Sequence, residues 1–68
     1  MRVEIINHDH LSVTMDMDYI PRIGETILLT TNENGVINGV VNDIEHWLFE
    51  GGSRDTQVTI YLRPKDID

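Results

Sequence analysis

The fold class of this chain is decided by the segment Ile27-Leu28-Leu29-Thr30-Thr31-Asn32-Glu33-Asn34-Gly35-Val36-Ile37. At its centre, Asn34-Gly35 is the dipeptide best able to place two successive residues at positive φ, as a tight hairpin turn requires. Apolar and β-branched residues flank this pair on both sides. The pattern predicts an antiparallel hairpin, with one strand over residues 25–31 and a long return strand over residues 36–49.

Three other segments have the pattern of strands. Residues 2–7 begin with an alternation of Arg2 and Glu4 against Val3 and Ile5, and they lead into a polar turn at residues 7–10. In residues 11–17 every odd position is apolar and every even position is polar, which is the period of a strand with one solvent-exposed face. We expect these two strands to form a hairpin, with a long loop over residues 8–17 as the alternative. A last strand is predicted over residues 56–62, with Val58, Ile60 and Leu62 facing the core, and Pro64 ends it.

The long return strand has two irregular features. Gly39 lies inside it, and a glycine within a strand predicts a bulge or a sharp bend. Its apolar residues recur every four positions, which fits a strand but also a short helix over residues 42–48. These residues are Val36, Val40, Ile44 and Leu48.

Turn-forming residues separate the strands. Pro21 and Gly24 mark a connector over residues 18–24, while Gly51-Gly52 with Ser53 and Asp55 predicts a flexible turn. An acidic tail follows at residues 66–68. Five short strands, one of them long and bent, predict an all-β fold: a small antiparallel barrel or a strongly bent meander sheet. We expect it to be SH3-like, with an OB-like barrel as the alternative, and to form one domain over residues 1–68.

Composition narrows the function classes. Twelve acidic and five basic residues give a formal charge of −7, which disfavours direct binding to nucleic acid or to an anionic membrane. The chain has no cysteine, so disulfides, thiolate metal sites and cysteine nucleophiles are excluded. No apolar run exceeds three residues, so we expect neither a signal peptide nor a membrane span. A soluble cytoplasmic protein is the expectation.

Few residues suggest a metal-binding or catalytic site. His8 and His10 would point to the same side of an extended strand, and His46 could complete a set of three nitrogen ligands for zinc. However, nothing in the sequence brings His46 near the other two, and polar residues of this kind usually serve the turn itself. The glycines match no phosphate-binding pattern, and Ser12 and Ser53 lie in no nucleophile motif. We therefore expect no metal site, no cofactor and no enzymatic activity.

The aromatic residues carry the main functional hypothesis. If Ile44 faces the core, then Glu45, Trp47 and Phe49 face outward on the long strand. Together with Tyr61 they would form an anchor for a protein partner, rimmed by acidic side chains. Because a bend in the strand exchanges its inner and outer faces, Trp47 could instead complete the core, and the pattern favours that role for Trp47.

Two segments resemble a known group of proteins. They are Ile20-Pro21-Arg22-Ile23-Gly24-Glu25, followed by the strand at residues 25–31, and Val41-Asn42-Asp43-Ile44-Glu45-His46. The order of these motifs, with a final alternating strand at residues 57–62, is similar to that of small uncharacterised β-barrel proteins of bacteria and phages. The resemblance covers residues 20–62 and implies an SH3-like barrel. It implies no activity.

The leading hypothesis is a non-enzymatic, acidic protein-interaction module that binds a basic site on a partner. In one form of it, a phage or mobile-element protein inhibits a host nucleic-acid-binding factor, with its carboxylates in place of phosphates. A second hypothesis is a homo-oligomeric structural or assembly subunit that pairs through its edge strands. A third is single-stranded nucleic-acid binding on an OB-like face, with Trp47, Phe49 and Tyr61 as stacking platforms.

Overall fold

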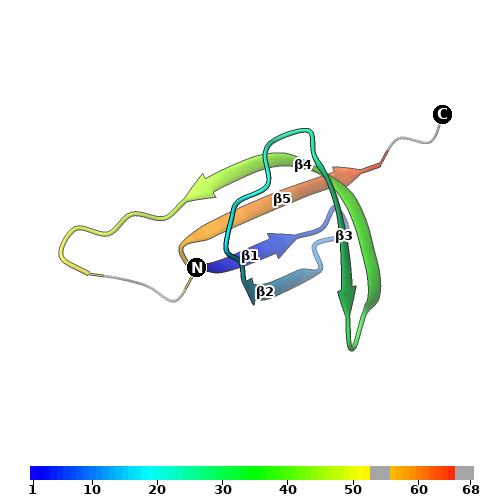
Figure 1. The fold of residues 1–68 in the computed structure, drawn as a ribbon, viewed down its shortest axis with the longest axis horizontal. Helices are drawn as coiled ribbons and strands as arrows, with labels where there is room; N and C mark the ends of the chain where they lie inside the picture. Colours follow the sequence, from blue (N-terminus) through cyan, green and yellow to red (C-terminus); the bar gives the residue numbers. More distant parts are fainter. Residues whose placement is uncertain (53–55, 66–68) are drawn as a thin grey trace.

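The computed structural model describes residues 1–52 and 56–65, which form one five-stranded sheet (Figure 1). The strands are β1 (Arg2–Ile6), β2 (Ser12–Asp16), β3 (Thr26–Thr31), β4 (Gly35–His46) and β5 (Val58–Pro64). The sheet curls strongly into a half-barrel, which confirms the predicted small, barrel-like all-β fold. The described part of the chain contains no helix that could cross a membrane.

β5 occupies the centre of the strand order β2-β1-β5-β4-β3. It pairs antiparallel with β4 and parallel with β1, where Val3 lies opposite Val58 and Ile5 opposite Ile60. The hairpin β1–β2 therefore joins the sheet on one side of β5, and the hairpin β3–β4 joins it on the other. The expected pairing of the first two strands is confirmed, with Ile5 opposite Val13.

The core fills the concave side of this sheet. Apolar side chains alternate with polar ones along β1, and the apolar ones, Val3 and Ile5, are almost completely buried. The apolar residues of β2 are half-buried, which confirms the period of two over residues 11–17. The buried cluster consists of Val3, Ile5, Ile37, Val41, Val58, Ile60 and Leu62.

The β3–β4 turn differs from the tight turn that Asn34-Gly35 predicts. Thr31 pairs with Gly35, so the loop has three residues, 32–34, and Gly35 alone adopts positive φ, at 69°. The hydroxyl of Thr31 stabilises this loop, because it accepts a hydrogen bond from the backbone N–H of Asn34 (2.9 Å) and donates one to the carbonyl of Gly35 (2.8 Å). A three-residue loop closed by a glycine of positive φ is also a common hairpin connection. The hairpin is confirmed, but the expected pair of successive residues at positive φ is wrong, because Asn34 does not adopt it.

β4 corrects three further expectations. The register shifts between Val41 and Asp43, so the bulge lies at Asn42 and not at Gly39. The strand ends at His46, three residues before the predicted end, and no helix forms over residues 42–48. Because the bulge exchanges the faces of the strand, the four-residue apolar spacing does not mark the core: Val36 is 59% exposed and Leu48 is 89% exposed.

The connector between β2 and β3 is tied to β4 by backbone hydrogen bonds. Gly24, at a φ of 94°, donates to the carbonyl of Val41, and the N–H of Val41 donates to the carbonyl of Glu25, both at 2.9 Å. Pro21, in the same connector, is buried. The predicted turn at residues 51–55 is described only at Gly51 and Gly52; Ser53, Asp55 and the acidic tail at residues 66–68 lie outside the described residues.

Because Gly39 has no side chain, Leu62 on the neighbouring strand can pack directly against it. A Cβ atom at position 39 would lie 3.0 Å from the Cβ of Leu62 and 3.1 Å from the carbonyl oxygen of Arg63. We predict that Gly39→Ala destabilises the fold by about 0.5–2 kcal/mol, because overpacking of about 1–3 kcal/mol outweighs the roughly 0.5–1 kcal/mol gained by replacing a strand glycine. Urea unfolding followed by Trp47 fluorescence measures this free energy.

Gly52→Ala is the matched control, because a Cβ there meets no atom within 4 Å. It should change the free energy of unfolding by less than about 0.5 kcal/mol. Equal effects of the two substitutions would show that Gly39 and Leu62 do not approach this closely.

Candidate protein-binding face

The convex side of the sheet gathers acidic and aromatic side chains from three strands. Since Val3 and Ile5 point into the core, Glu4 between them points outward. The register places Glu4 and Glu45 on either side of Thr59, and Asp43 opposite Tyr61. Trp47 follows directly after β4. We call this set the acidic–aromatic face: Glu4, Asp43, Glu45, Trp47 and Tyr61.

Tyr61 lies at the centre of the acidic part of this face. Its hydroxyl donates a 2.6 Å hydrogen bond to Oε1 of Glu45. This bond to a carboxylate raises the pKa of Tyr61 above its ordinary value of 10.0, and desolvation and the negative charges of Glu45, Glu4 and Asp43 raise it further. The phenol therefore stays neutral and acts as a donor among three carboxylates. A cation brought to this place would meet all three charges.

Trp47 is anchored at the edge of the face. Its indole Nε1–H donates a 2.8 Å hydrogen bond to the hydroxyl of Thr59, which is 2% exposed, and its backbone N–H donates to the carbonyl of Gln57 at 2.8 Å. Trp47 itself keeps 40% of its surface exposed and does not belong to the core cluster. The expectation that it completes the core is therefore wrong. The bulge at Asn42 sets the face on which the end of β4 presents its side chains, and it places Trp47 outside.

The structure brings together three of the four residues singled out in the sequence. Glu45 and Tyr61 are in contact, and Trp47 reaches the same face through Thr59, the register partner of Glu45. Phe49 lies three residues beyond the end of β4, on the segment that leaves the sheet, and is 53% exposed. Glu4 and Asp43 were missed. The alternation around Glu4 predicts that it faces outward, but only the β1–β5 pairing shows which residues it lies beside.

The histidines do not form a cluster. His8 and His10 lie in the β1–β2 loop, where His10 takes a φ of 71° as a turn residue, and His46 ends β4. Within residues 1–52 and 56–65, no group of three or more His, Cys, Asp or Glu side chains is arranged to hold a metal ion.

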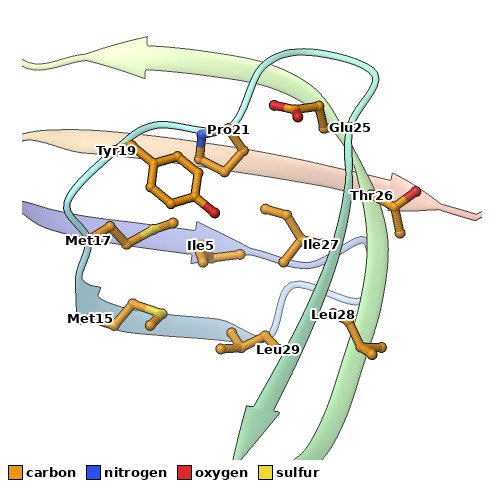
Figure 2. A pocket seen from close by; sticks show the side chains of 10 residues that line it. All are labelled: Ile5, Met15, Met17, Tyr19, Pro21, Glu25, Thr26, Ile27, Leu28 and Leu29. Carbon is orange, nitrogen blue, oxygen red and sulfur yellow. The ribbon is translucent and has the colours of Figure 1, made fainter.

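The concave side holds a small apolar hollow (Figure 2). Its volume is about 250 Å³, below the roughly 300–1,000 Å³ typical of small-molecule sites. The only ionisable groups among its lining residues are Tyr19 and Glu25. Such a lining offers apolar contact but no set of converging acid and base groups. The other lining residues are Ile5, Met15, Met17, Pro21, Thr26, Ile27, Leu28 and Leu29.

Comparisons with protein-family models, with curated proteins and with solved structures find no match to this chain. The similarity to small bacterial and phage barrels therefore stays a prediction.

The raised pKa of Tyr61 can be measured directly. In a Tyr19→Phe background, Tyr61 is the only phenol, and absorbance at alkaline pH should give a pKa above 10.0. Glu45→Gln should lower that pKa, because it removes the charge on the accepting group. Since the folded pKa is the higher one, the stabilisation from this contact is complete below the unfolded pKa and is lost as pH rises through the folded pKa.

Glu33→Gln, in the exposed β3–β4 turn, is the control for a lost carboxylate elsewhere. If Glu45→Gln leaves the pKa of Tyr61 no lower than Glu33→Gln does, the Tyr61–Glu45 bond does not exist in solution.

Proposed function

We propose that this protein is a non-enzymatic binding module whose acidic–aromatic face docks on a basic site of a partner protein. The observation that carries the proposal is the Tyr61–Glu45 hydrogen bond, flanked by Glu4 and Asp43 and lying beside the anchored indole of Trp47. Aromatic side chains held rigidly at a surface lose little entropy on binding and dominate many interfaces. Carboxylates around them favour a partner rich in Lys and Arg.

Binding would proceed in two steps. The net charge of −7 steers a basic surface toward the face, and this attraction weakens as salt shortens the Debye length. Contact then buries Trp47 and Tyr61, whose hydrogen bonds to Thr59 and Glu45 already fix their orientation. The absence of cysteine fits a reducing compartment, so we place this activity in the cytoplasm.

A specific form of the proposal is inhibition of a nucleic-acid-binding protein, in which the carboxylates occupy a phosphate site, as a phage or mobile-element protein would do. Glu4 on β1 and the pair Asp43 and Glu45 on β4 flank the central strand β5, and all three charges act on Tyr61, so they form a negative patch around it. Direct binding of single-stranded nucleic acid is the weaker alternative, because the same charges repel phosphates next to Trp47 and Tyr61. Quenching of Trp47 fluorescence by an oligonucleotide would favour that alternative.

Matched variants test the proposal. The wild-type protein and the Glu45→Lys, Trp47→Ala and Asp18→Lys variants serve as bait in native-cell extract, and the affinity of a captured protein is then measured with each purified variant. We predict that Glu45→Lys and Trp47→Ala each weaken the dissociation constant at least about 30-fold, as at an interface hot spot. Asp18→Lys changes the net charge as Glu45→Lys does, but Asp18 lies exposed in the connector between β2 and β3, outside the acidic–aromatic face, and the variant should change the constant less than about threefold.

The salt dependence of the same complex gives a second measurement. Affinity should fall steeply between low and high salt for the wild type and less steeply for Glu45→Lys. Equal losses for Glu45→Lys and Asp18→Lys would mean that overall charge, not this face, binds the partner.

A further inference from the structure

The sheet does not close into a barrel. β2 and β3 are its two edge strands, and no Cα atom of β2 lies within 8 Å of one in β3. Paired strands lie only about 4.7–4.9 Å apart, so the opening is wider than direct pairing allows. The outer backbone edges of β2 and β3 therefore face an opening on the concave side. We call this opening the seam.

Apolar side chains line the middle of the seam from both sides. Figure 2 shows Met15 and Met17 projecting toward it from β2 and the residue that follows β2's end, and Ile27 and Leu29 projecting from β3. All four are only half-buried although they pack against the core, so the seam leaves apolar surface uncovered. Methionine side chains adapt to different neighbours, which suits a surface that is covered on binding.

Two hollows extend the seam along its length. The first, of about 250 Å³, includes Glu25. The second, of about 280 Å³, lies between β2 and the β3–β4 turn and includes Glu33. Each volume suits one or two side chains. The residues that line the second hollow are Ser12, Val13, Thr31, Asn32, Glu33 and Asn34.

The charged residues that line the two hollows of the seam are both acidic. Glu25 precedes β3 and Glu33 follows it, and neither hollow is lined by any Lys, Arg or His residue. The six residues of β3 lie between the two carboxylates, which corresponds to roughly 20 Å of extended strand. An occupant that complements this surface is extended, apolar in its middle and basic at both ends. A second copy of this chain fits poorly, because it adds another −7 of charge.

We propose that the seam binds an extended segment of a partner protein, with alternating apolar side chains and a Lys or Arg at each end, as an added strand. Its backbone pairs with the free edge of β2 or β3, its apolar side chains fill the two hollows, and its basic residues meet Glu25 and Glu33. The inference goes beyond the proposed function, because the seam lies on the concave side and the acidic–aromatic face on the convex side. Either site can bind without the other.

A synthetic peptide tests this site. The probe is a fluorescein-labelled peptide of roughly eight residues, with lysine at both ends and alternating valine and threonine between them. We predict saturable binding to the full chain, measured by anisotropy at low salt. A peptide with glutamate at both ends should bind at least about tenfold more weakly, because its ends face Glu25 and Glu33. A central proline, which cannot donate to a strand edge, should also weaken binding.

Variants locate the peptide. Glu33→Lys should weaken binding about three- to tenfold, whereas Glu50→Lys, the same charge change outside the seam, should change it less than about twofold. Met15→Lys places a charge in the seam and should abolish binding, with circular dichroism confirming the fold. Glu45→Lys should leave peptide binding within about twofold, so that failure of the seam and failure of the acidic–aromatic face are separate results.

Three outcomes would overturn the proposal. The first is no saturable binding at concentrations on the order of millimolar. The second is equal affinity for the lysine-ended and glutamate-ended peptides. The third is a dimer in sedimentation that Met15→Lys dissociates, because the occupant of the seam would then be a second copy.

Discussion

β5 forms hydrogen bonds with β1 along one edge and with β4 along the other, and this double pairing holds the two hairpins in one sheet. Its inward side chains, Val58, Ile60 and Leu62, are at most 5% exposed and supply much of the core. Thr59 is buried on the opposite face, where its hydroxyl accepts the bond from Trp47. A strand whose inward side chains are buried in this way has few alternative registers, because a slip of one residue would expose its whole apolar set.

The curvature that follows from this arrangement creates two different surfaces. On the convex side, strand spacing brings Glu4, Asp43 and Glu45 around a phenol that acts as a donor. On the concave side, the sheet stops before closure, so the methionines of the seam stay half-exposed and two strand edges are left unpaired. Both surfaces are negative and both present apolar groups, which is why we propose a basic protein partner, and not a phosphate-bearing one, for each.

Local pattern predicted most of the strands, because alternation and turn residues act over a few neighbours. The β1–β2 hairpin, the alternation over residues 11–17 and the burial of Val58, Ile60 and Leu62 follow from such signals. The errors arise where distant contacts decide. Position 39 requires a glycine because Leu62, distant in the sequence, packs directly against it. The bulge at Asn42 is visible only in the pairing of β4 with β5. For the same reason Glu45 and Tyr61 were singled out, while Glu4 and Asp43, whose roles depend on register, were missed.

Native-state hydrogen exchange of the backbone amides tests the central position of β5 most directly. If β5 joins the two hairpins, the hydrogen-bonded amides of residues 58–62 exchange most slowly of all, and only by global unfolding. Those of β2 and β3, which have one unpaired edge each, exchange faster through local opening. Exchange of the β5 amides at the rates of an edge strand, with slowest exchange elsewhere in the sheet, would contradict the strand order and both surfaces built on it.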